Sequence, residues 1–173
     1  MKSIFLCGFM GCGKTTVGKI LAARTGREFI DMDKYIEKKE NMTVSQIFEK
    51  HGEDYFRDLE HQVCKELSEK NNLIVATGGG ALTYKRNADI IRKNATVLFI
   101  SVPIEIIADR LKNDTTRPLL QREDRQQAMK ELYDKRMPLY KDAATVIADG
   151  SQSPGAVANL IISTMGLKKA PKK

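Results

Sequence analysis

Gly8-Phe9-Met10-Gly11-Cys12-Gly13-Lys14-Thr15 matches the phosphate-loop pattern G-x-x-x-x-G-K-[ST] at every fixed position. An apolar run of strand length, residues 4–7, precedes it, and apolar residues at helical spacing follow it as far as Gly26. A strand, a glycine-rich turn and a helix in this order are the context that the pattern requires. The stretch therefore predicts an anion-binding turn in an α/β fold; the alternative is a glycine-rich turn with no ligand.

The backbone of this turn is predicted to wrap a phosphate group. Glycine allows the N–H groups to point inward, and the start of the following helix adds positive potential. Lys14 is expected to reach the β- and γ-phosphates, and Thr15 to ligate Mg²⁺. The residues expected to contact the nucleotide here are Gly11, Cys12, Gly13, Lys14, Thr15 and Thr16.

The composition favours one domain with a modest positive charge. The chain has 173 residues, 42% of them hydrophobic, and a net charge of +7. Four lysines lie in the last six residues, and without them 25 basic residues face 22 acidic ones. This balance suits small anionic substrates at least as well as nucleic acid, and the basic tail is expected to be a solvated end.

The three cysteines, Cys7, Cys12 and Cys64, lack metal-ligand spacing and cannot all pair, which favours a reducing compartment such as the cytoplasm. The apolar run at the N-terminus reaches Lys14 too soon for a signal peptide. No segment approaches the length of a membrane span. We expect a monomer that binds neither membrane nor nucleic acid.

Residues 28–33 are predicted to form a second strand that ends in two carboxylates. Asp31 and Asp33 would share one side of the extended chain, because side chains alternate along a strand. Ligands of open α/β sheets collect beyond the carboxyl ends of the strands, so one acid could serve Mg²⁺ and the other a substrate hydroxyl. The alternative is that Asp33 caps a helix that starts at Lys34.

The middle of the chain combines helical patterns with a glycine triplet. Thr43 and Gln46 fit a capping box, and Gly52 is a plausible stop. An apolar stripe then predicts a helix over about 53–70, with Arg57 off the stripe as either a solvated or a binding residue. The buried strand expected at 73–77 leads directly into residues 78–80, three glycines that suggest close approach of backbone to a ligand or a loose turn.

The rest of the chain continues the alternation of strands and helices. Strands are expected at 96–100 and 144–148, and helices at 103–112, 125–140 and from Ser153 onward. The polar stretch between the first two helices indicates a mobile lid, about 112–124, or a solvated loop. The fold class predicted is α/β: a three-layer αβα sandwich around a five-stranded parallel sheet.

Over about residues 2–167 the chain resembles the shikimate kinase family. The resemblance rests on the phosphate loop and on five further motifs in a specific order: Asp31-Met32-Asp33, Phe56-Arg57-Asp58-Leu59-Glu60, Gly78-Gly79-Gly80, Arg117-Pro118-Leu119-Leu120 and Arg136-Met137-Pro138-Leu139-Tyr140. It implies a single kinase domain of the nucleoside-monophosphate-kinase type, with a substrate-binding insertion at about 34–60. The implied activity is transfer of the γ-phosphoryl group of ATP to the 3-hydroxyl of shikimate, in aromatic amino acid biosynthesis.

The resemblance also implies roles for individual residues. Arg57 and Arg136 match arginines that grip the shikimate carboxylate, and Asp33 matches the acid that binds the ring hydroxyls and is a candidate base. Gly79 and Gly80 would lie beside the ring, and Asp31 near Mg²⁺. On the nucleotide side, Arg110 matches a position that packs on adenine, and Arg117 the lid arginine over the phosphates. The implied catalytic residues are Lys14, Asp33 and Arg117.

Three other functions remain open from the residues alone. A gluconate or nucleoside-monophosphate kinase would share the loop and the lid but not the combination of Asp33 with Arg57 and Arg136. A nucleotide-dependent binding switch would hydrolyse ATP slowly whatever the acceptor. A nucleic-acid binder would need an aromatic platform or a basic recognition helix, and neither is apparent.

Overall fold

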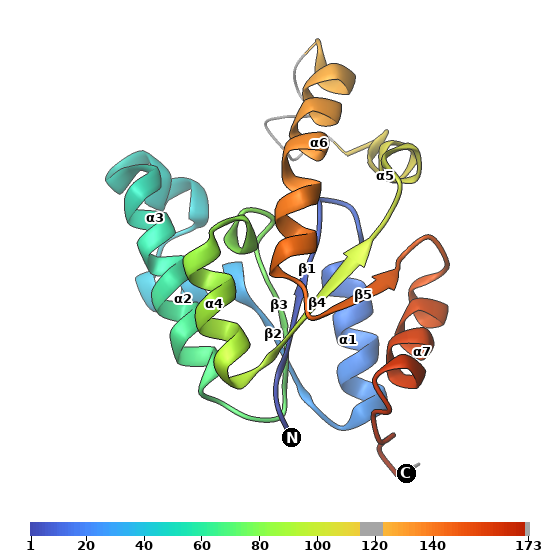
Figure 1. Ribbon diagram of the computed structural model, residues 1–173. Helices are drawn as coiled ribbons and strands as arrows, with labels where there is room; N and C mark the ends of the chain where they lie inside the picture. The colour runs from blue at the N-terminus through green and yellow to red at the C-terminus, as the bar shows by residue number, and fades with distance from the viewer. Residues whose placement is uncertain (115–122, 172–173) are drawn as a thin grey trace.

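The computed structural model describes residues 1–114 and 123–171, and its centre is a parallel sheet of order β2-β3-β1-β4-β5 (Figure 1). The strands are β1 (Ile4–Cys7), β2 (Glu28–Asp31), β3 (Leu73–Ala76), β4 (Thr96–Ser101) and β5 (Val146–Asp149). β1 and β3 are buried at every residue, whereas the edge strands β2 and β5 are partly exposed. The predicted five-stranded parallel sheet is confirmed. The prediction succeeded because the strands of a sheet that is covered on both faces are continuous apolar runs.

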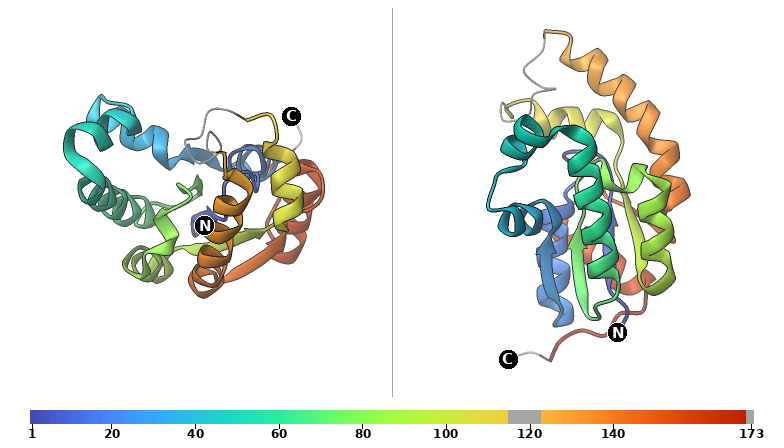
Figure 2. Two further views of the ribbon diagram at one scale, coloured as in Figure 1. Left: turned by 90° about the horizontal axis from the view of Figure 1, so that it is seen from above. Right: turned by 90° about the vertical axis from the view of Figure 1, so that its left-hand side faces the viewer.

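Helices cover both faces of this sheet, which Figure 2 shows from above. The helices are α1 (Lys14–Thr25), α2 (Met32–Glu40), α3 (Val44–Ser68), α4 (Lys85–Asn94), α5 (Ile104–Leu111), α6 (Arg125–Ala143), α7 (Pro154–Thr164) and the 3-10 helix η1 (Ala81–Thr83). α1 and α7 pack together on one face, while α4 and α6 cover the other. α2 pairs with α3 beyond the edge strand β2. The predicted αβα sandwich is thus confirmed.

The second strand is shorter than predicted, because a helix begins inside its expected range. β2 ends at Asp31, whose Oδ1 accepts a hydrogen bond of 3.3 Å from the backbone N–H of Lys34 and so caps α2. Asp33 therefore lies in the first turn of a helix. The expectations that Asp31 and Asp33 share one side of a strand, and that Asp33 is the cap, were both wrong.

Further along the chain, Gly52 interrupts α3 as expected. Its φ of 82° and ψ of 176° are not helical, so two helical stretches meet at this glycine, and the capping box of Thr43 and Gln46 at the start of α3 is confirmed. α4 and η1 were not predicted. Only three side chains of α4 are buried, Asn87, Ala88 and Ile91, and most of its other residues are charged or polar. The helix therefore has too few apolar residues to show a helical pattern in the sequence.

All five strands end at the same edge of the sheet, because they are parallel. The phosphate loop follows β1, α2 follows β2, and the glycine triplet follows β3 at this edge. The three cysteines, Cys7, Cys12 and Cys64, are free and buried. None of the helices that the structure describes is long and apolar enough to cross a membrane.

Candidate active site

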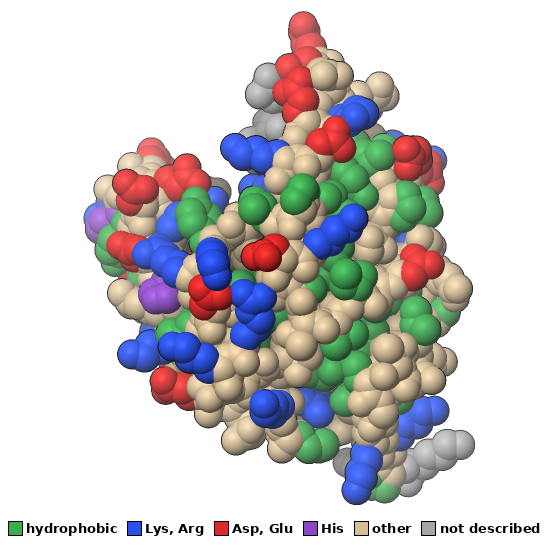
Figure 3. Space-filling view, in the orientation of Figure 1, with side chains coloured by type: hydrophobic (Ala, Val, Ile, Leu, Met, Phe, Trp, Pro, Cys, Tyr) green, Lys and Arg blue, Asp and Glu red, His purple; other side chains and the backbone are tan. Residues whose placement is uncertain are grey.

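A cavity of about 620 Å³ lies at the carboxyl edge of the sheet. Its wall includes the phosphate loop, Asp31 and Asp33, the glycine triplet, Arg110 and Arg136. It opens between the α2–α3 pair and α6, where Figure 3 shows the surface hollowed. The cavity therefore brings together residues predicted for both halves of the site, although Cys12 and Arg57 are not among those that line it.

The phosphate loop has the backbone that its glycines predict. Gly8, Gly11 and Gly13 have φ values of 145°, 76° and 98°, a region that side chains disfavour. A Cβ at Gly8 would lie 2.7 Å from the carbonyl oxygen of Ile100. Gly13 is the N-cap of α1, and no side chain among the described residues caps this helix end. The uncapped N–H groups at the start of α1 are thus available as hydrogen-bond donors to an anion in the cavity.

Lys14 folds back over this loop. Its Nζ donates hydrogen bonds to the carbonyl oxygens of Gly8 (2.7 Å) and Phe9 (3.2 Å) and lies 3.8 Å from the Sγ of Cys12. Lys14 is thus held over the loop, with its ammonium group at the carbonyl oxygens of Gly8 and Phe9. A cation here can neutralise phosphate charge.

Thr15 and Asp31 form an oxygen pair at the other side of the loop. The Thr15 hydroxyl donates to Asp31 Oδ2 at 3.2 Å, while Asp31 Oδ1 caps α2. One hydroxyl and one carboxylate fit Mg²⁺, which prefers oxygen ligands, keeps several waters and needs few protein groups beside phosphates. Within residues 1–114 and 123–171 there is no cluster of three or more His, Cys, Asp or Glu that could hold a metal.

Arg110 joins the loop to the segment after β5. Its Nη2 donates to the Gly150 carbonyl oxygen (2.9 Å), and its Nη1 lies 3.4 Å and 3.5 Å from those of Gly11 and Cys12. The side chain lines the cavity, consistent with a place beside the nucleotide. Arg117 and most of the expected lid lie outside the described residues.

Asp33 is the acid on the acceptor side of the cavity. Its Oδ1 is buried and accepts no hydrogen bond from the described residues. Burial, and then the charge of Asp31, raise the pKa of Asp33, with a smaller opposing effect of Lys14. A buried acceptor without a donor is costly, so Asp33 Oδ1 is available to accept a hydrogen bond from a ligand.

Arg57 is fixed by two acids and two rings. Its Nη1 donates to Glu60 at 2.7 Å, and its Nε and Nη2 donate to Glu53 at 3.1 and 2.9 Å. The guanidinium carbon lies 5.6 Å from the Phe56 ring centre and 5.3 Å from that of Tyr84. With 16% of its side chain exposed, Arg57 is not the solvated helical arginine that was one alternative.

Glu60 was missed as a site residue, although the sequence carried a signal. It is 1% exposed, and it falls on the apolar stripe with Phe56, Val63 and Leu67. An acid at such a position needs a buried partner, which Arg57 supplies. Burial raises the pKa of Glu60 more than Arg57 lowers it.

The glycine triplet makes room for three of these side chains. A Cβ at Gly78 would lie 2.7 Å from Asp33 Oδ1, and one at Gly80 would lie 2.7 Å from Arg57 Nη1. At Gly79 the nearest atom would be the Nη1 of Arg136, at 3.6 Å. The triplet is therefore the backbone around which one acid and two arginines converge, and the alternative of a loose turn is wrong.

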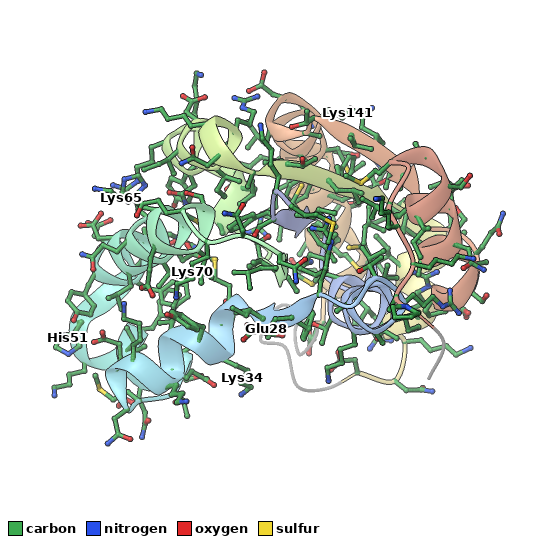
Figure 4. The ribbon with its side chains drawn as sticks, turned by 90° about the horizontal axis from the view of Figure 1, so that it is seen from below. Glu28, Lys34, His51, Lys65, Lys70 and Lys141 are labelled. Atoms are coloured by element: carbon green, nitrogen blue, oxygen red, sulfur yellow. The ribbon has the colours of Figure 1, made fainter. Side chains whose placement is uncertain are left out.

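The charged side chains away from this site lie at the periphery. In Figure 4 the labelled Lys34, His51, Lys65 and Lys141 project outward from their helices. The cavity instead combines a phosphate-type anion site at one end with Asp33 and Arg136 at the other, where Arg57 lies beside Gly80. Such a pair of subsites can hold a nucleotide and a small acidic acceptor that carries hydroxyl groups.

Comparison with known proteins indicates one family. The sequence profile of the family described as "Shikimate kinase" matches residues 10–166. A shikimate kinase of Thermodesulfovibrio yellowstonii is 43% identical over 162 residues, 94% of each chain. The structure of shikimate kinase from Acinetobacter baumannii in complex with shikimate aligns with a TM-score of 0.87 and 39% identity, covering 95% of this chain and 93% of that one.

A more distant similarity concerns the fold alone. A gluconokinase of Sinorhizobium meliloti aligns with a TM-score of 0.60 at 17% identity, over 95% of this chain and 91% of that one. The fold is therefore shared with a protein of a different name, and by itself it does not specify an acceptor.

Proposed function

This chain belongs to the shikimate kinase family, and on that premise we propose that it transfers the γ-phosphoryl group of ATP to the 3-hydroxyl of shikimate, giving shikimate 3-phosphate and ADP. The observation that carries the proposal is the convergence of Asp33, Arg57 and Arg136 on the glycine triplet, opposite the phosphate loop. Shikimate offers the matching groups, a carboxylate and ring hydroxyls. A guanidinium fork suits a planar carboxylate in two-point geometry.

On the acceptor side, Arg57 and Arg136 would hold the carboxylate of shikimate, with Gly79 and Gly80 against the ring. Asp33 would accept the proton of the attacking hydroxyl, because its buried Oδ1 lacks a donor. The hydroxyl oxygen then forms a bond to the γ-phosphorus as the bond between that phosphorus and the bridging oxygen of ADP breaks. We further propose residues 34–60 as the substrate-binding insertion and 112–124 as the lid.

On the nucleotide side, the N–H groups from Gly11 to Thr16 would cradle the phosphates, and Lys14 and Arg117 would neutralise their charge. Arg110 would lie beside the adenosine part. Thr15 and Asp31 would hold Mg²⁺, which neutralises phosphate charge when bound. We also propose a monomer in the cytoplasm, since three buried free thiols favour a reducing compartment.

The test is release of ADP in the presence of Mg²⁺ and ATP, with shikimate, gluconate, AMP or no acceptor. We expect strong release with shikimate alone. Release with gluconate or AMP would keep the kinase fold but overturn the roles given to Asp33, Arg57 and Arg136. Slow release that is the same with every acceptor would indicate a nucleotide-dependent switch.

A further inference from the structure

Tyr140 lies on α6 one turn beyond Arg136 and directs its hydroxyl group at the glycine triplet. The side chain is 1% exposed, and its ring stacks on Phe99 of β4 with centroids 5.5 Å apart. The hydroxyl donates a hydrogen bond of 2.5 Å to the carbonyl oxygen of Gly79. The ring therefore belongs to the core, whereas its one polar atom reaches the acceptor side of the site.

The same carbonyl oxygen also faces Arg136. Arg136 Nη1 lies 3.5 Å from Gly79 O, at the outer limit of a hydrogen bond, whereas the Tyr140 bond is short. Burial raises the pKa of the Tyr140 hydroxyl, so the group stays protonated and can donate at any working pH. Tyr140 thus satisfies the carbonyl, so this oxygen does not depend on the guanidinium of Arg136 as its donor.

We propose that Tyr140 is a positioning residue for the carboxylate of the acceptor, a step that rests on the proposed function. By holding Gly79 O it fixes the loop that faces the acceptor, and it keeps Arg136 from being used by a backbone carbonyl. Without this hydroxyl the partly buried carbonyl would draw Arg136 toward itself, because an unpaired buried acceptor is costly. Tyr140 itself does not touch the acceptor.

Tyr133 provides a matched control on the same helix. Its hydroxyl also donates to a backbone carbonyl oxygen, that of Val102 at 2.9 Å, and its ring packs on Phe9. Tyr133→Phe and Tyr140→Phe therefore each remove one hydroxyl from α6 and keep the ring. Only the second change removes a bond to Gly79.

The experiment measures kcat and both KM values for the two variants. We expect Tyr140→Phe to raise the KM for shikimate about tenfold, the equivalent of one hydrogen bond to a buried group, and to leave the KM for ATP within about twofold. Tyr133→Phe should change the shikimate KM less than about twofold. In an Arg136→Lys background, Tyr140→Phe should have little further effect, because the two residues act through one another. An unchanged shikimate KM, or the full tenfold effect in the Arg136→Lys background, would overturn the proposal.

A second measurement needs no acceptor. Amide hydrogen exchange of residues 78–83 in the free protein should be faster in Tyr140→Phe than in the wild type and unchanged in Tyr133→Phe. Unchanged exchange in Tyr140→Phe would overturn the proposal whatever the acceptor is. If the wild type does not phosphorylate shikimate, the proposed function is overturned. Faster exchange in Tyr140→Phe would then still support the hydrogen bond from Tyr140 to Gly79.

Discussion

Glu53 and Glu60 both pair with Arg57, but they differ in burial, and their replacement by alanine separates two ways of estimating stability. Glu53 accepts two hydrogen bonds from the guanidinium and is 59% exposed, whereas Glu60 accepts one and is 1% exposed. A count of hydrogen bonds predicts that Glu53 contributes more to stability than Glu60. The degree of burial predicts the reverse.

The magnitudes follow from exposure. Breaking a buried ion pair by removing one partner costs roughly 3–5 kcal/mol, because the remaining charge is left buried without compensation. Arg57 is 16% exposed and would keep Glu53, so we expect Glu60→Ala to lower the free energy of unfolding by about 2–4 kcal/mol. Glu53→Ala should cost less than about 1 kcal/mol, as exposed pairs do.

Urea unfolding near neutral pH, followed by far-ultraviolet circular dichroism, measures both values, and equal slopes in urea would show that the unfolded states are comparable. The KM for shikimate should rise more in Glu60→Ala than in Glu53→Ala, because Glu60 is the buried anchor of Arg57. A stability loss in Glu53→Ala that equals or exceeds that in Glu60→Ala would refute the reasoning from burial.

Three further predictions concern the site. Asp33→Asn should lower kcat about 10²–10⁴-fold if the carboxylate accepts the proton. The pKa of Asp33 is raised in the fold, so its contribution to stability is complete below the unfolded-state pKa and is lost as pH rises through the folded-state value. The variant should therefore melt at a higher temperature than the wild type near neutral pH but not in acid, and a difference independent of pH would contradict this. Gly78→Ala would place a Cβ 2.7 Å from Asp33 Oδ1 and 3.1 Å from Glu60 Oε1; we expect weaker shikimate binding by about 1–3 kcal/mol and unchanged ATP binding in calorimetry. Arg117→Ala should lower kcat roughly 10³-fold or more with little change in the shikimate KM, and unchanged turnover would remove Arg117 from the catalytic residues.

The parts of the fold set by local signals could be predicted from the sequence. The phosphate loop, the helix after it and the buried strand over 73–76 each combine a residue pattern with a matching apolar period. The start of α2 could not be predicted, because Asp31 can either continue a strand or cap a helix. Only its hydrogen bond with Lys34 distinguishes the two.

The candidate site was predictable in its residue types but not in its geometry. Arg57 and Arg136 come from helices far apart in the chain, and the sheet brings them to one loop. The place of Glu60 on an apolar stripe indicated its burial, whereas the direction of the Tyr140 hydroxyl depends on that packing and on no local pattern.

The buried cysteines allow local opening of the folded protein to be measured by thiol labelling. Cys12 lies in the phosphate loop, and Cys64 lies in α3 with its Sγ 3.8 Å from the sulfur of Met32, the residue between the two aspartates. A thiol reagent can modify either one only when its surroundings separate from the core. The labelling rates of Cys12 and Cys64 would therefore report how often the nucleotide side and the acceptor side open locally. Unequal rates would show that the two sides open independently, and no cysteine has to be introduced for this measurement.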